Sequence, residues 1–221
     1  MRYMVMEKGL GTLNSVGTGL FRGDQPLLNA VYVMIKVIEG LSVLHAQGIV
    51  HGDVHPVNVL VIETDPVDVR LIGFGASFFQ EERSREPDFH RPSNSRFYSM
   101  LSHWTIQGYR NSFRDDVYRA LWIGAMVMQG PGLSEYCDSL QSSGPSELVG
   151  FKERQFIFSY PGNTIDILRT VPPADESAVR AHLQNALDLA RSVQEVQGHP
   201  PYDLILDELR KVAAILTTGN N

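Results

Sequence analysis

The chain has 221 residues, of which 43% are hydrophobic and 20% are charged, values ordinary for a globular protein with a sizeable core. Nineteen basic residues stand against 25 acidic ones, giving a net charge of −6. This balance argues against nucleic acid as a partner, because phosphate binding needs a dense basic surface.

A single cysteine, Cys137, excludes an internal disulfide and a cysteine-based zinc site. The N-terminus lacks the pattern of a signal peptide, and no apolar run approaches the ~20 residues that span a bilayer. We therefore expect a cytoplasmic or nuclear protein with no membrane partner.

The N-terminal segment predicts a strand followed by a glycine-rich connection. The apolar run Tyr3-Met4-Val5-Met6 is typical of a short strand, and Gly9 and Gly11 end it. Residues 14–26 predict a loop or a short helix.

A long helix and a hairpin come next. Apolar residues recur at helical spacing from Leu27 to Leu44, and Gly48 ends that helix. The apolar, β-branched segments 57–62 and 69–72 predict a two-stranded hairpin that turns at residues 64–66.

The rest of the chain is mostly helical. Residues 76–112 carry few periodic apolar residues and predict a long loop. Four further helices are predicted at 115–128, 146–159, 176–196 and 202–216. Asp175 or a neighbouring residue could cap the helix at 176–196. The first of the four is apolar on most sides and is expected at the centre. The pattern predicts one mainly α domain, a helical bundle with a small β-hairpin and a short N-terminal strand.

The most informative segment is His51-Gly52-Asp53-Val54-His55-Pro56-Val57-Asn58. It places an aspartate and an asparagine five residues apart, between the apolar runs 48–50 and 59–62. The tripeptide Gly73-Phe74-Gly75 follows the asparagine by about fifteen residues. This layout resembles the catalytic loop of protein kinases, in which the tripeptide is Asp-Phe-Gly.

Other segments match the same family in the same order. These segments are His51-Gly52-Asp53, Ser95-Arg96-Phe97-Tyr98-Ser99-Met100, Ser112-Phe113-Arg114-Asp115-Asp116 and Pro201-Tyr202-Asp203-Leu204. Together they resemble the casein kinase I and vaccinia-related kinase group. The resemblance implies a single protein-kinase-like domain over residues 1–221 that contains only the C-terminal lobe. Residues 1–13 would be the last strand of the N-terminal lobe and the hinge, and residues 14–221 the helical lobe.

The resemblance also implies roles for individual residues. Asp53 takes the place of the catalytic base, His55 replaces the usual loop lysine, and Asn58 is a candidate magnesium ligand. The aspartate that holds the main metal ion in kinases is replaced by Gly73. Asp116 corresponds to a buried carboxylate that accepts hydrogen bonds from the backbone of the catalytic loop.

The hinge and adenine side would be formed by Met4, Met6, Glu7, Leu60 and Ile72. Neither a glycine-rich phosphate loop nor a strand lysine precedes these residues. We therefore expect no cofactor, and ATP with magnesium only if an N-terminal lobe is supplied.

The same residues permit simpler interpretations. Asp53 could brace the loop without chemistry, and Asn58 could order the loop by hydrogen bonds rather than bind a metal ion. We expect His51 to be a packed, hydrogen-bonded ring. We expect His45 and His103 to be ordinary helix or loop residues.

The resemblance thus implies a catalytically impaired pseudokinase that acts as a protein-binding or scaffold module. Its partner, a different protein or a second copy, would bind the face that an N-terminal lobe normally covers. The alternative is a fragment of a Ser/Thr protein kinase, or one complemented by an N-lobe, that transfers the ATP γ-phosphate to protein hydroxyls. A nucleotide sensor without transfer is a third interpretation.

Overall fold

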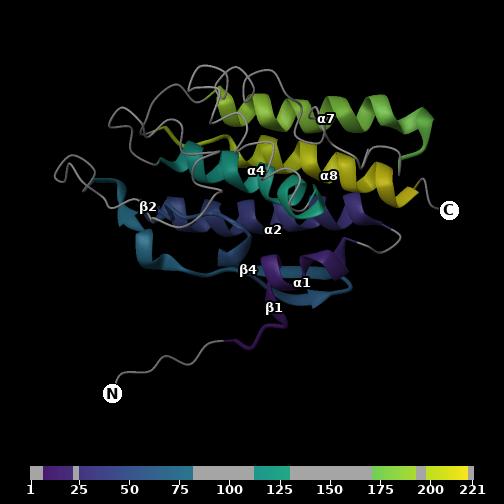
Figure 1. Ribbon diagram of the computed structural model, residues 1–221. Coiled ribbons are helices and arrows are strands. Elements are labelled where there is room, and N and C mark those ends of the chain that lie inside the picture. The colour runs from purple at the N-terminus through teal and green to yellow at the C-terminus, as the bar shows by residue number, and fades with distance from the viewer. Residues whose placement is uncertain (1–6, 22–24, 82–111, 130–170, 193–197, 219–221) are drawn as a thin grey trace, which may run out of the picture.

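The computed structural model describes residues 7–21, 25–81, 112–129, 171–192 and 198–218 (Figure 1). The predicted strand at residues 3–6 and the predicted helix at 146–159 lie outside these ranges.

The helices stack in layers around one central helix. Helix α2 (Pro26–Ala46) lies between the β-strands on one side and helices α4 (Phe113–Gln129) and α8 (Tyr202–Thr218) on the other. Helix α7 (Pro173–Arg191) packs on α8 and α4 as the outer layer (Figure 1). The fold is mainly helical with small antiparallel sheets, which confirms the predicted fold class.

The larger sheet has the strand order β1-β3-β4 and covers one side of α2. Strands β3 (Val59–Thr64) and β4 (Val67–Leu71) form the predicted antiparallel hairpin, with Val61 opposite Val69. Strand β1 (Gly11–Thr12) pairs with β3 and leads into helix α1 (Leu13–Leu20). The short helix is thus one of the two structures expected for residues 14–26.

A second, two-stranded sheet joins β2 (Ile49–Val50) to β5 (Phe78–Phe79). The prediction of a loop over residues 76–112 was wrong at its start. The two strands have only two residues each, too few for an alternating pattern, so only tertiary pairing defines them.

Helix α2 begins with Pro26 in its first turn, where the missing N–H costs no hydrogen bond. It ends as predicted at Gly48, whose φ of +73° is left-handed and whose N–H bonds the carbonyl of His45. Its length of 21 residues and its mean hydropathy of 1.7 over an 18-residue window suffice to cross a membrane. The statement that no apolar run approaches this length was therefore wrong. However, 56% of that window is buried inside the fold, as in a core helix.

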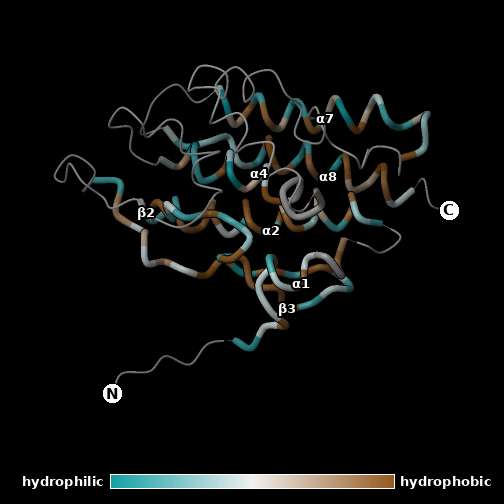
Figure 2. Tube along the Cα trace, in the orientation of Figure 1, coloured by the Kyte–Doolittle hydropathy of each residue, from teal (hydrophilic) through white to brown (hydrophobic). Residues whose placement is uncertain are grey.

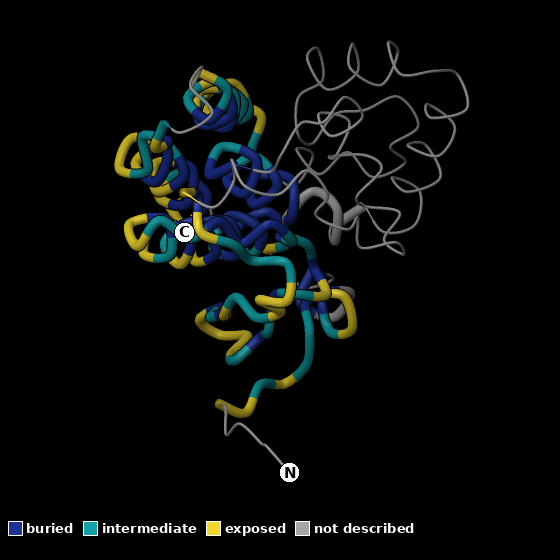
Figure 3. Tube along the Cα trace, turned by 90° about the vertical axis from the view of Figure 1, so that its left-hand side faces the viewer, coloured by how far each residue is buried: buried dark blue, intermediate teal, exposed yellow. Residues whose placement is uncertain are grey.

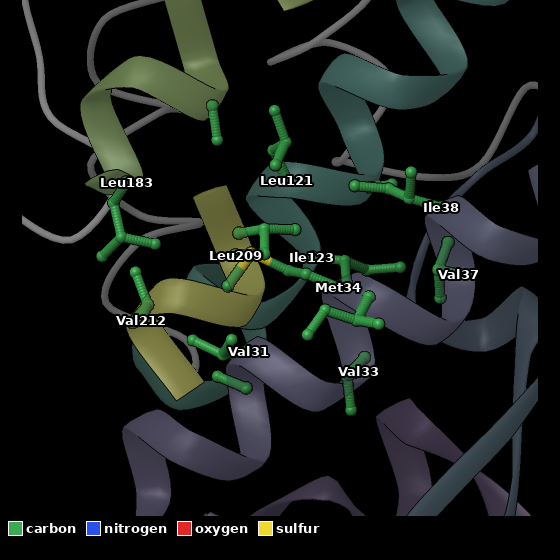
Figure 4. Close-up of a cluster of buried hydrophobic side chains, with 14 of the residues drawn as sticks. Val31, Val33, Met34, Val37, Ile38, Leu121, Ile123, Leu183, Leu209 and Val212 are labelled. Atoms are coloured by element: carbon green, nitrogen blue, oxygen red, sulfur yellow. The ribbon is translucent and has the colours of Figure 1, made fainter. Parts of the chain in front are cut away.

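The hydrophobic core lies where α2, α4, α7 and α8 face one another. Figure 4 shows side chains of all four helices in contact there, among them Met34, Leu121, Leu183 and Leu209. Figure 2 shows that α2 is hydrophobic along most of its length, whereas hydrophobic and hydrophilic residues alternate along α7. Buried residues gather between the helices and exposed ones on their outer turns (Figure 3).

Helix α4 starts with a capping box. The backbone N–H and the hydroxyl of Ser112 donate to Asp115 Oδ2 at 2.8 and 2.6 Å, and the N–H of Asp115 donates in return to Ser112 Oγ at 3.4 Å. Helix α7 was predicted to be capped by Asp175 or a neighbour, and that was wrong. It follows Pro172, which makes no side-chain cap, and Asp175 instead lies in the first turn, where its charge complements the helix dipole.

A polar cluster ties α7 to α8. Glu208 Oε2 accepts hydrogen bonds from His182 at 2.8 Å and Asn185 at 3.0 Å, while Glu208 Oε1 lies 2.7 Å from Lys211 Nζ. These hydrogen bonds, the one from Lys211 first, lower the pKa of Glu208 to about 2.

This cluster predicts a pH-dependent part of the stability. Because the pKa of Glu208 falls on folding, its stabilisation is complete above its ordinary pKa of 4.5 and is lost as the pH drops towards about 2. We expect Glu208→Gln to lower the free energy of unfolding at pH 6 and to matter less at pH 3, as measured by urea denaturation. Glu176→Gln, which breaks a pair with Arg180 inside α7, is the control. An equal effect of Glu208→Gln at both pH values would contradict the prediction.

Candidate functional site

The segment 51–58 connects β2 to β3 and lies at the start of α4. One buried carboxylate, that of Asp116, accepts hydrogen bonds from its backbone. Asp116 Oδ2 accepts the N–H of His51 at 2.7 Å, and Asp116 Oδ1 accepts the N–H of Gly52 at 3.0 Å. These contacts confirm the structural role expected for Asp116. Burial raises the pKa of Asp116, but a hydrogen bond from His45 and nearby positive groups outweigh it, so the pKa lies below its ordinary value.

Both backbone polar groups of Gly52 are hydrogen-bonded to side chains of α4. Its N–H binds Asp116, and its carbonyl accepts a hydrogen bond from Arg119 at 3.0 Å. Its φ of +78° lies in the left-handed region, which glycine occupies without steric cost. Helix α4 therefore fixes the backbone immediately before Asp53.

His45 links this carboxylate to the last helix, and the expectation that it is an ordinary helix residue was wrong. Its ring is fully buried, with Nε2 3.1 Å from Asp116 Oδ2 and Nδ1 hydrogen-bonded to the hydroxyl of Tyr202. Burial, with the charge of Asp116, raises the pKa of Tyr202, so its hydroxyl stays protonated and donates to Nδ1. The ring also stacks on Phe113, with centroids 4.4 Å apart. In the sequence, the burial of His45 is indicated by its position one helical turn after the buried Leu41.

His51 is the packed, hydrogen-bonded ring that was expected. Its Nδ1 accepts the N–H of Asp53 at 3.2 Å, so the proton sits on Nε2, which donates to the carbonyl of Ile72 at 3.0 Å. Burial lowers the pKa of His51, which favours this neutral form.

The structure brings together the three residues predicted as catalytic, Asp53, His55 and Asn58. Asn58 Nδ2 donates to Asp53 Oδ2 at 2.7 Å and to the Asp53 carbonyl at 2.9 Å. His55 Nε2 lies 3.0 Å from Asp53 Oδ1. His55 Nδ1 accepts the N–H of Val57 at 3.2 Å, and its Nε2 also lies 3.2 Å from Asn58 Nδ2. Both carboxylate oxygens of Asp53 therefore face side chains of the same loop.

Asn58 does not have the orientation of a metal ligand. Its donor nitrogen faces Asp53, and its Oδ1 faces Gly73, where an added Cβ would lie only 2.2 Å away. Magnesium requires several oxygen ligands in near-octahedral geometry, whereas Asp53 Oδ2 already accepts a hydrogen bond from Asn58 and Oδ1 lies 3.0 Å from His55 Nε2. The donor set therefore does not fit magnesium. Among the described residues, no group of three or more His, Cys, Asp or Glu side chains could hold a metal ion.

The predicted hinge and adenine-side residues are only partly described. Met4 and Met6 lie outside the described ranges. Glu7 is exposed, and its carboxylate lies 3.5 Å from Arg70 Nε. Ile72 donates its N–H to the carbonyl of Asn58 at 2.9 Å and so braces the loop.

The side chain of Leu60, the predicted adenine floor, packs against the backbone of Gly9. A Cβ added to Gly9 would sit 2.5 Å from Leu60 Cγ, so the backbone of Gly9 rests on this side chain without room for a methyl group. The next residues continue over the sheet, since Leu10 donates its N–H to the carbonyl of Val61 at 2.8 Å. The backbone of residues 9 and 10 therefore covers Leu60 and this part of β3.

The segments around the loop also expose large apolar side chains. Phe74, which follows Gly73, is 51% exposed, and its ring lies 5.1 Å from that of His51. Leu10 is 61% exposed beside the sheet. Isolated exposed apolar residues are common, but Phe74 belongs to the Gly-Phe-Gly segment and Leu10 to the segment for which the sequence predicts the hinge.

The chain is distantly similar to mitogen-activated protein kinases. It is 26% identical to Mitogen-activated protein kinase hog1 of Trichoderma harzianum and to HOG1 of Gibberella zeae, over 188 residues in each case. These alignments cover 83% of this chain and 48% of each relative. HOG1 of Cryphonectria parasitica is 24% identical over the same coverage. No protein-family model matches the chain.

The chain spans about half the length of the curated relatives that it matches. Over most of its length the chain is thus distantly similar to protein kinases. The finer resemblance to the casein kinase I and vaccinia-related group stays a prediction.

The contacts of Asp116 predict a graded series of variants. Asp116→Asn places an amide nitrogen against a buried backbone N–H, and we expect the free energy of unfolding to fall by about 3 kcal/mol or more. Tyr202→Phe removes only the outer hydrogen bond to His45, and we expect a fall of about 1 kcal/mol. Urea denaturation measures both, and hydrogen exchange of the His51 and Gly52 amides should quicken only in Asp116→Asn. The reverse order of the two effects would contradict this assignment.

Proposed function

We propose that the chain is a catalytically impaired, protein-kinase-like lobe that acts by binding another protein. The observation that carries the proposal is that the carboxylate of Asp53 contacts side chains of its own loop. In a working kinase this carboxylate must be free to accept the proton of a substrate hydroxyl. Here Asn58 donates to its Oδ2 at 2.7 Å, and His55 Nε2 lies 3.0 Å from its Oδ1.

The electrostatic requirements of phosphoryl transfer support the same conclusion. The reaction depends on metal ions and cationic groups placed around the phosphates. Gly73 offers no carboxylate, Asn58 points its nitrogen inward, and His55 stands where the kinase loop carries a lysine. Loss of one preorganised electrostatic contact typically slows a reaction by ~10²–10³, so the combined losses are expected to be severe although they do not add simply.

We further propose that the protein-binding face is the one that an N-terminal lobe covers in kinases. The exposed Leu10 and Phe74 support this placement, since both belong to segments that line this face in the resemblance. A second copy or a different protein could bury them. Within the superfamily we propose the casein kinase I and vaccinia-related group, on the basis of His51-Gly52-Asp53 and the Arg114-Asp115-Asp116 start of α4. We propose a cytoplasmic or nuclear location.

The second candidate function is a Ser/Thr protein kinase completed by an N-terminal lobe from elsewhere. The retention of Asp53 and Asn58 at kinase spacing favours it. In that case the added lobe would have to lift the backbone of Gly9 off Leu60 and release Asp53 from Asn58.

Nucleotide binding and transfer distinguish the two candidates. We expect no rise in melting temperature with ATP, with or without magnesium, and no transfer of γ-³²P from ATP to casein or myelin basic protein. Asp53→Asn is the control, and its background labelling should equal that of the unmodified chain. Robust labelling that Asp53→Asn abolishes would overturn the proposal, whereas a metal-independent thermal shift without transfer would indicate a nucleotide sensor.

The proposed face can be tested through self-association. If a second copy is the partner, Leu10→Ser with Phe74→Ser should convert a dimer into a monomer in sedimentation experiments, because polar side chains lose the burial energy of the apolar ones. Leu204→Ser is the matched control, since Leu204 is 56% exposed on α8 and away from this face. A chain that is monomeric at all concentrations would remove self-association from the proposal, and equal effects of all three changes would remove this face.

A further inference from the structure

We infer that Gly73 and Asn58 form a steric interlock, in which the missing side chain at position 73 allows Asn58 to close over Asp53. The inference deepens the proposed function and rests on it, because it names the residue that keeps the loop closed. It makes position 73 more than the site of a lost metal ligand. The glycine creates the space that the asparagine now fills.

The geometry at Gly73 leaves no room for any other residue. An ideal Cβ there would lie 2.2 Å from Asn58 Oδ1, 2.4 Å from Cγ and 2.9 Å from Nδ2. Real side chains do not approach so closely, so a substitution requires one of the two groups to move. In addition, φ at Gly73 is +80°, which strains any residue with a Cβ. Space and backbone strain thus act together at this position.

The main chain of Asn58 cannot move to relieve the overlap without further losses. Its N–H donates to the carbonyl of His55 at 2.9 Å, and its carbonyl accepts the N–H of Ile72 at 2.9 Å. The simplest adjustment is therefore a rotation of the Asn58 side chain. That rotation breaks the bonds from Nδ2 to the carboxylate and to the carbonyl of Asp53.

A side chain at position 73 would consequently open the loop. Asp53 would lose the partner of its Oδ2 while keeping the contact of its Oδ1 with His55. The hydrogen bond from Asn58 to the Asp53 carboxylate thus depends on the glycine at position 73. A carboxylate introduced by Gly73→Asp would displace the Asn58 side chain rather than join it. Restoring the kinase-like tripeptide therefore reorganises the loop.

The chain offers a control that separates steric overlap from backbone strain. Gly48 has a φ of +73°, close to that of Gly73, but an added Cβ there would meet nothing within 4 Å. Gly48→Ala therefore measures the strain alone. We expect Gly73→Ala to lower the melting temperature by about 4 °C or more beyond the effect of Gly48→Ala, from the usual cost of overpacking.

The interlock further requires that this excess depend on Asn58. In an Asn58→Ala background, where the overlapping amide is absent, Gly73→Ala should lower the melting temperature by no more than Gly48→Ala does. If Gly73→Ala alone fails to fold, the double variant Asn58→Ala with Gly73→Ala should recover folding. Equal effects at positions 73 and 48, or an excess that persists without Asn58, would overturn the inference. Failure of the double variant while Asn58→Ala and Gly48→Ala fold would also overturn it.

A second measurement reads the contact itself. In the folded Gly73→Ala variant, the side-chain NH₂ resonances of Asn58 should move towards solvent-exposed values and their exchange with water should quicken, whereas Gly48→Ala should leave them unchanged. Unchanged Asn58 resonances in Gly73→Ala would count against the interlock. None of these measurements involves phosphoryl transfer, so a failure here and a failure of the proposed function are distinguishable.

Discussion

One buried carboxylate organises the region that carries the kinase-like residues. Asp116 is fully buried in α4 and accepts hydrogen bonds from two successive backbone N–H groups of the loop and from His45. A buried ionised group is tolerable only when such donors replace its water. The start of the loop therefore depends on the packing of α4 against α2, and through Tyr202 it is also tied to α8.

This anchor explains how the loop keeps its shape without a bound nucleotide or metal ion. The backbone before Asp53 is fixed by Asp116 and Arg119, whose contacts do not involve nucleotide or metal. The side chains that follow then satisfy one another. Asn58 donates to Asp53, His55 Nε2 lies 3.0 Å from the other oxygen of that carboxylate, and Gly73 provides the space in which the asparagine lies. The residues that resemble a catalytic centre thus contribute to a self-contained loop.

A second glycine allows the backbone to pack closely on a side chain. Leu60, for which the sequence predicts the adenine floor, is covered by the backbone of Gly9. Two glycines, at positions 9 and 73, allow the chain to fill places that larger residues would keep open. Leu10 and Phe74 are among the large apolar side chains that the described residues expose near these two contacts.

Short-range patterns in the sequence were enough to predict most of the secondary structure. Helical spacing located α2, α4, α7 and α8, the β-branched runs located the β3–β4 hairpin, and Gly48 marked the end of α2, because these signals depend on residues a few positions apart. The family resemblance selected Asp53, His55, Asn58 and Asp116 by their order along the chain. Only the tertiary structure decided how they meet. The bonds from His45 to Asp116 and Tyr202 join residues 71 and 157 positions apart, and the two-residue strands β2 and β5 exist only as a pair. Likewise, the overlap of Asn58 with position 73 depends on side-chain orientation, which no pattern of residue types encodes.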